Sequence, residues 1–91
     1  MSVKVRIPTQ LRALAGGAAE VEVQATTVGE ALKALDASHP GFSERLFDEG
    51  GELRRFVNVF LGEEDVRFMD GLSTSVQEGA VVSVVPAVAG G

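Results

Sequence analysis

The 91-residue sequence predicts a single α+β domain in which a mixed sheet packs on one main helix. Two segments near the N-terminus alternate apolar and polar residues, residues 28–35 repeat apolar residues at helical spacing, and residues 80–85 form an apolar, β-branched run. Strand and helix segments do not alternate regularly along the chain. This favours α+β over a doubly wound α/β arrangement.

The first two predicted strands form a hairpin. Residues 3–7 alternate apolar and basic side chains, and Pro8 ends the strand because proline cannot donate a hydrogen bond to the ladder. Residues 20–24 alternate in the same way, and we expect residues 9–19 between them to form a long turn with Gly16-Gly17 at its tip. The residues expected to face inward are Val3, Val5, Ile7, Val21 and Val23.

The main helix is predicted to begin at Thr27. Thr27 and Glu30 have the spacing of a capping box, in which each side chain accepts from the backbone N–H of the other residue. Pro40-Gly41 stops the helix, residues 42–47 are expected to hold one or two helical turns, and residues 48–52 form an acidic, glycine-rich loop. The apolar positions of the main helix are Val28, Ala31, Leu32 and Leu35.

The second half of the chain is predicted to add the remaining strands. Residues 55–61 are β-prone, and residues 62–65 form a turn before a short strand at 66–68. A brief helical turn anchored by Leu72 and Val76 precedes the final strand, residues 80–85, which we expect to lie centrally beside the first strand. Along 55–61, one face carries Val57, Val59 and Leu61, and the other carries Phe56, Asn58 and Phe60.

Charge and composition limit the classes of partner. The net charge of −5 argues against a nucleic-acid or anionic-membrane surface, because both require a basic face, and it suits docking on a basic partner. There is no cysteine, so no disulfide, thiolate nucleophile or cysteine metal site is possible. Neither a charged-then-apolar leader nor an apolar run of membrane-spanning length is evident, so we expect a cytoplasmic protein.

No constellation of residues predicts autonomous catalysis. The only histidine, His39, stands at the predicted helix end, where a capping or surface role is usual. The carboxylate cluster Glu63-Glu64-Asp65 has the composition of a solvated hairpin tip and lacks the ligand offsets of a calcium loop. We therefore expect no catalytic residue, no metal site and no cofactor bound by the chain itself, and we predict that the protein is not an enzyme.

The last residues, 86–91, are small and uncharged. Such a thread can enter a narrow tunnel, and two terminal glycines let another backbone approach closely. The only reactive group at its tip is the α-carboxylate of Gly91. Composition alone favours a frayed terminus. The absence of any other reactive constellation favours the functional interpretation, with residues 1–85 as the folded domain and 86–91 as a flexible tail.

The order strand, strand, helix, strand, followed by a terminal Gly-Gly, resembles the ubiquitin-like β-grasp sulfur carriers of the ThiS/MoaD family. Within that family it is most similar to the carriers of cysteine biosynthesis. The segments that carry the resemblance are residues 3–8, 55–59, 64–68, 71–72 and 86–91. The resemblance implies a β-grasp fold with a sheet of about five strands.

The resemblance also implies a mechanism. A partner related to ubiquitin-activating enzymes would use Mg-ATP to adenylate Gly91, and a sulfur donor would then displace AMP to leave a thiocarboxylate. Gly90, Ala89 and Val88 would thread through the partner's tunnel. The acceptor would be a PLP-dependent cysteine synthase, with a metalloprotease releasing cysteine. A thiazole, thiosugar or molybdopterin pathway, a role as molybdopterin synthase small subunit, and a ubiquitin-like protein modifier remain alternatives.

A docking surface is expected on the sheet face that turns away from the helix. Phe56, Phe60 and Val85 would share this face near the root of the tail, where exposed aromatic side chains serve as interface anchors. Alternatively, Phe56 and Phe60 cover a second small core under residues 48–52. The basic side chains that can pair with acidic partner residues or remain solvated are Arg54, Arg55 and Arg67.

Overall fold

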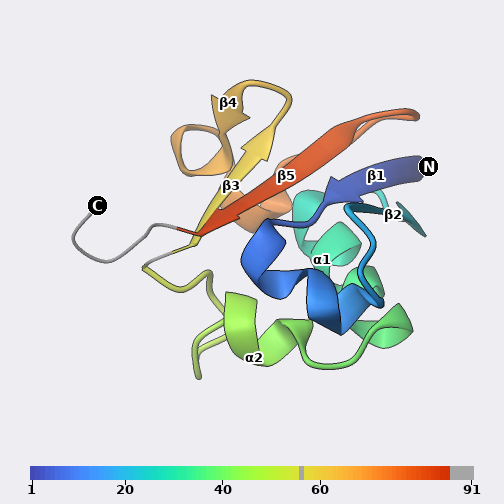
Figure 1. Ribbon diagram of the computed structural model, residues 1–91. Helices are drawn as coiled ribbons and strands as arrows, with labels where there is room; N and C mark the ends of the chain where they lie inside the picture. Colours follow the sequence, from blue (N-terminus) through green and yellow to red (C-terminus); the bar gives the residue numbers. More distant parts are fainter. Residues whose placement is uncertain (56, 87–91) are drawn as a thin grey trace.

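The computed structural model describes residues 1–55 and 57–86 as a five-stranded mixed sheet with helices on one face (Figure 1). The strands are β1 (Ser2–Arg6), β2 (Glu20–Gln24), β3 (Val57–Leu61), β4 (Glu64–Asp65) and β5 (Val81–Pro86). The helices are α1 (Val28–Ser38) and α2 (Phe42–Leu46), with 3-10 turns η1 (Thr9–Ala15), η2 (Val66–Phe68) and η3 (Gly71–Ser73). The predicted α+β class is confirmed.

The strands lie in the order β2-β1-β5-β3-β4, with β5 in the centre. β1 and β2 form the expected antiparallel hairpin, in which Val3 is opposite Val23. β5 runs parallel to β1, with Val5 opposite Val82, and antiparallel to β3, with Val59 opposite Val84. The prediction that the final strand lies centrally beside the first is therefore confirmed.

The hydrophobic core lies between the sheet and α1. Thr27 caps α1 as expected, because its hydroxyl accepts from the Glu30 N–H at 3.2 Å. Gly29 allows a close approach of η3, since a Cβ there would stand 3.1 Å from the carbonyl oxygen of Leu72. The largest fully buried side chains are Phe42, Ile7, Leu32, Leu35, Leu46, Val3, Val5, Val28, Val59, Val66 and Val82.

The capping box is incomplete. The Glu30 carboxylate does not reach the Thr27 N–H, and instead accepts from the Thr26 N–H at 2.9 Å and the Thr26 hydroxyl at 2.7 Å. Thr26 offers two donors to one carboxylate oxygen, whereas a capping box offers one.

Two other local predictions are wrong. Residues 9–19 are not a plain turn, because Thr9–Ala15 forms η1 and buries Ala15. Residues 66–68 are not a strand: Asp65 accepts from the Arg67 N–H at 2.9 Å and starts η2, while the preceding Glu64–Asp65 pairs with β3. The helical turn predicted within 71–78 is limited to Gly71–Ser73.

Within the described ranges, no helix has both the length and the apolar composition needed to cross a bilayer.

Candidate functional site

The root of the C-terminal tail is held in the middle of the sheet. β3 flanks β5 to its last residue, with Asn58 opposite Val85 and Val57 opposite Pro86. On the other side, the pairing with β1 stops at Ser83, which is opposite Arg6. The described residues therefore end in a strand whose position and direction are fixed by β1 up to Ser83 and by β3 up to Pro86.

The outer face of the sheet, which turns away from α1, carries apolar side chains beside this root. Val85 is 44% exposed, and Phe60 on β3 is half-buried. Val85 shares the outer face with its cross-strand partner Asn58 on β3. Phe60 lies two residues after Asn58 on β3 and therefore points to the same face. The predicted sharing of one face by Phe60 and Val85 is confirmed, whereas their role in docking stays a prediction.

Arg67 fixes β3 from the side. Its guanidinium donates to the Asn58 side-chain oxygen at 2.7 Å and to the carbonyl oxygens of Val57 at 2.6 Å and Arg54 at 2.9 Å. Arg54 in turn donates to the Glu44 carbonyl oxygen at 3.0 Å. Both side chains thus form hydrogen bonds within the protein. Arg55, the third arginine that can contact a partner, is exposed and forms no such side-chain bond among the described residues.

Two carboxyl groups have pKa values below their ordinary range, and both act in the scaffold. The Thr26 hydroxyl is the main donor that lowers the pKa of Glu30, with the Thr26 N–H second. The Ser43 N–H, at 2.9 Å, is the main cause of the lowered pKa of Asp36, which also accepts from the Gly41 N–H at 3.2 Å. Glu30 stabilises the start of α1, and Asp36 stabilises the junction of α1 with α2. Neither group lies at the root of the tail.

A family model described as ThiS family matches residues 5–91, which includes the tail. The chain belongs to the ThiS family.

Individual relatives agree with this assignment. The ThiS-family chain is 46% identical to sulfur carrier protein CysO of Mycobacterium tuberculosis over 93 residues, covering all of both chains. The crystal structure of the Amycolatopsis orientalis BexX/CysO complex contains a chain with a TM-score of 0.91 and 44% identity, covering 98% of this chain and 99% of that one. SAMP1 of Haloferax volcanii has a TM-score of 0.85 and 31% identity, with full coverage of both chains.

These likenesses establish the ubiquitin-like β-grasp fold for the ThiS-family chain. The residues predicted for activation and threading, Gly91, Gly90, Ala89 and Val88, lie outside the described residues, as does Phe56. Their roles therefore stay predictions.

The other singled-out polar residues occupy structural positions in the ThiS-family chain. His39 is the C-cap of α1, and its backbone N–H donates to the Leu35 carbonyl oxygen at 2.8 Å. Of the acidic cluster, Glu63 lies in the turn after β3, and Glu64 and Asp65 form β4. Residues 1–55 and 57–86 contain no group of three or more His, Asp or Glu side chains placed to hold a metal ion.

Sequence reasoning missed two features near the tail root. The hydrogen bonds from Arg67 to Arg54, Val57 and Asn58 were not predicted, because residues 66–68 are expected to form a short strand. Arg12 in η1 lines a hollow together with Val85 and Pro86. This position was not predicted because residues 9–19 are expected to form a turn, although the spacing of Leu11, Leu14 and Ala15 is typical of a helical turn.

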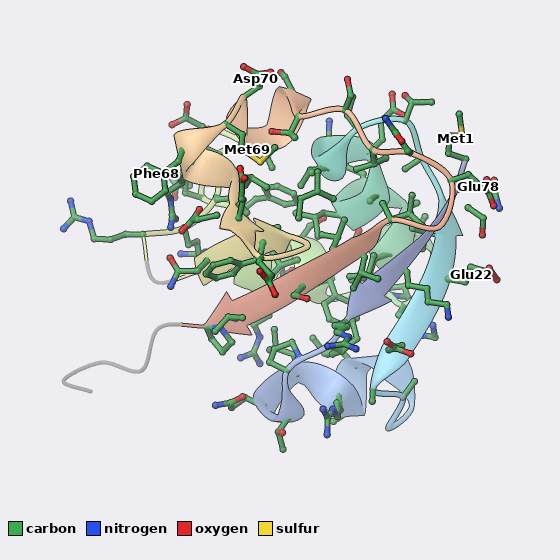
Figure 2. The ribbon with its side chains drawn as sticks, turned by 90° about the horizontal axis from the view of Figure 1, so that it is seen from above. Met1, Glu22, Phe68, Met69, Asp70 and Glu78 are labelled. Atoms are coloured by element: carbon green, nitrogen blue, oxygen red, sulfur yellow. The ribbon has the colours of Figure 1, made fainter. Side chains whose placement is uncertain are left out.

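The exposed Phe68 was also unexpected. It is 89% exposed at the end of η2 and points away from the sheet (Figure 2).

Proposed function

We propose that this chain is a sulfur carrier whose Gly91 carboxylate is converted to a thiocarboxylate, and that the sulfur serves cysteine biosynthesis. The observation that carries the proposal is the similarity to sulfur carrier protein CysO over the whole chain, at 46% identity. The tail supports it, because Gly90 and Gly91 end a segment without charged or bulky side chains.

The proposed chemistry occurs on the α-carboxylate of Gly91. A free carboxylate is a poor acyl donor, so an adenylating partner would first join it to AMP with Mg-ATP and release pyrophosphate. A sulfide-level donor would then attack the carbonyl carbon, and AMP would leave. The resulting thiocarboxylate sulfur is a soft nucleophile, ready to attack an amino-acrylate on a PLP-dependent cysteine synthase, after which a metalloprotease would release cysteine.

The folded domain would act as the part that partners recognise. Since β5 is bordered by β3 up to Pro86, the tail leaves the domain in a defined direction. Docking of the domain would place Gly91 within reach of the partner's reaction centre. Delivery within the docked complex raises the local concentration of sulfur without releasing free sulfide.

Intact-mass spectrometry tests the proposal. Protein isolated from its host should include a species with the mass gain of one sulfur in place of one oxygen, and deletion of Gly91 should abolish it. Gly50→Ala is the matched control, because Gly50 is exposed and far in sequence from Gly91, and this variant should retain the sulfur-containing species. If the full-length chain never gains this mass with its adenylating partner, Mg-ATP and a sulfide donor, the carrier function is refuted.

A protein-modifier function is the second candidate, supported by the likeness to SAMP1. In that case Gly91 would form isopeptide bonds with lysines of target proteins. High-mass conjugates that survive denaturing gels and strong reductant, and that vanish on deletion of Gly91, would identify it. Thiocarboxylate without such conjugates would exclude it.

A further inference from the structure

A groove of about 440 Å³ opens beside the last described residue, Pro86. It exists because β5 continues for three residues beyond the point where β1 ends. β1 ends at Arg6, opposite Ser83, and the chain then turns through Pro8 into η1. Residues 84–86 of β5 are therefore left without a strand neighbour on that side among the described residues. Figures 1 and 2 both show η1, in blue, close to the C-terminal end of β5.

The groove is basic although the protein is acidic. Its walls include Arg6, Arg12, Gln10, Pro8, Val85 and Pro86, and none of its described lining residues is a carboxylate. The whole chain has 13 Asp and Glu against 8 Lys and Arg, so this local excess of positive charge opposes the overall balance. Glu20, which pairs with Arg6, lines a neighbouring hollow together with Arg6 and Arg12, so the two guanidinium groups have one carboxylate beside them.

Both guanidinium groups are oriented before any partner binds. Arg12 is half-buried, and its Nε donates to the Ile7 carbonyl oxygen at 3.0 Å. Arg6 donates through Nε to Glu20 at 3.1 Å. In the described part of the chain, the terminal Nη atoms of neither residue have a hydrogen-bond acceptor. An arginine held at Nε loses less conformational freedom when its Nη pair binds a carboxylate.

Charged groups at the other end of the sheet have the opposite sign. The N–H of Ser2 donates to Glu78 at 2.8 Å, and its hydroxyl donates to Glu22 at 2.6 Å. Figure 2 shows Glu22 and Glu78 near Met1, at the end of the sheet away from the tail. Carboxylates thus lie at the end of the sheet away from the tail, whereas Arg6 and Arg12 lie at the end where the tail leaves.

We propose that this groove docks an extended acidic segment of the adenylating partner. The inference rests on the proposed function, because a partner that takes Gly91 into a tunnel must bring the tunnel mouth close to Pro86. A carboxylate side chain on that segment pairs with the Nη atoms of Arg12 and Arg6. The segment's backbone lies along the free side of residues 84–86, as added strands do on open sheet edges.

Steady-state kinetics of carrier-dependent ATP–pyrophosphate exchange by the adenylating enzyme of the same host tests this. Arg12→Glu should raise the KM for the carrier by about tenfold or more, with a smaller change in kcat. Arg45→Glu is the matched control, because it makes the same change of charge at an exposed residue on α2, away from the groove. It should change KM by less than about twofold. Equal KM values for the two variants would overturn the proposal.

Arg6→Gln covers the case in which Arg12→Glu does not fold. The Arg6 side chain is 64% exposed and its internal partner is one exposed carboxylate, so its loss should leave folding intact. The KM of the wild-type carrier should rise with salt, and that of Arg6→Gln should rise less steeply. Identical salt dependence would overturn the proposal.

Two further outcomes are distinguishable. If the wild-type chain supports no exchange at all, the carrier function itself fails and the groove proposal fails with it. If wild-type carrier alone sediments as a dimer and Arg12→Glu as a monomer, the groove binds a second copy of this chain, and the proposed occupant is wrong.

Discussion

The two faces of the sheet differ in what covers them. On the inner face, Val5, Val59 and Val82 belong to the same buried cluster as the apolar side chains of α1, and all three are 0% exposed. On the outer face, Val85 is 44% exposed and Phe60 is half-buried, and Arg6 on β1 lies opposite Ser83, two residues before Val85. The inner face accounts for why this sequence folds. The outer face and the groove at its end are not needed for the core, and we expect them to select the proteins that bind the domain.

The largest effect is expected on the inner face. Leu32 on α1 is 0% exposed, so Leu32→Ala should lower the free energy of unfolding by about 2–5 kcal/mol through lost burial and a residual cavity. Chemical denaturation measures this. Thiocarboxylate formation per folded molecule should be unchanged, since Leu32 faces the core.

Lys33 provides the matched control because it is the exposed neighbour of Leu32 on the same helix. Lys33→Ala should change stability by no more than about 0.5 kcal/mol. Equal losses for the two variants would mean that burial under α1 does not set the stability of the sheet.

A smaller stability effect, but a larger docking effect, is expected at Phe60 on the outer face. Phe60→Ala should raise the KM for the adenylating partner about tenfold, as loss of an aromatic anchor does. Its unfolding free energy should fall less than that of Leu32→Ala, because Phe60 is only half-buried.

The exposed Lys33 on α1, which covers the other face of the sheet, serves as the control for Phe60, and Lys33→Ala should change neither stability nor KM appreciably. An unfolded Phe60→Ala protein would instead assign Phe60 to the core, the alternative that the sequence left open.

The sequence predicted the elements whose side chains alternate or repeat. The pattern of residues 3–7 and 20–24 gave the hairpin, and Thr27 with the apolar residues after it gave α1. β4 was missed because its two residues, Glu64 and Asp65, are polar and too few to show a period. The apolar Val66 suggested a strand there, but it is buried within η2.

The candidate site was predictable only in part. Gly91 stands out in the sequence because it closes a segment of small, uncharged residues, and its role stays a prediction. The groove was not predictable, because it brings Arg6 beside Ser83, 77 positions apart, through a parallel pairing whose register no local pattern encodes. The negative net charge favours a basic partner, whereas the groove suits an acidic segment. The total charge could not indicate this, because it carries no information about where Arg6 and Arg12 lie.

The smallest effect on stability is expected at Asp36, whose charge holds the start of α2 against the end of α1. The Asp36 carboxylate accepts from the N–H groups of Gly41 and Ser43, and these bonds hold its folded-state pKa below the ordinary value of 3.8. The unfolded chain therefore takes up the proton first as the pH falls. The stabilisation is complete above the ordinary pKa and is lost as the pH decreases through the lower, folded-state value.

Asp36→Asn should accordingly lower the free energy of unfolding at neutral pH by up to about 1 kcal/mol, the usual worth of a capping side chain. The difference from wild type should shrink as the pH falls below 3.8. Denaturation curves at several pH values measure it, with Glu49→Gln, an exposed charge loss in the loop after α2, as the control. A difference that persists unchanged to low pH would show that α2 is held over the core by packing of Phe42 and Leu46, independent of the charge on Asp36.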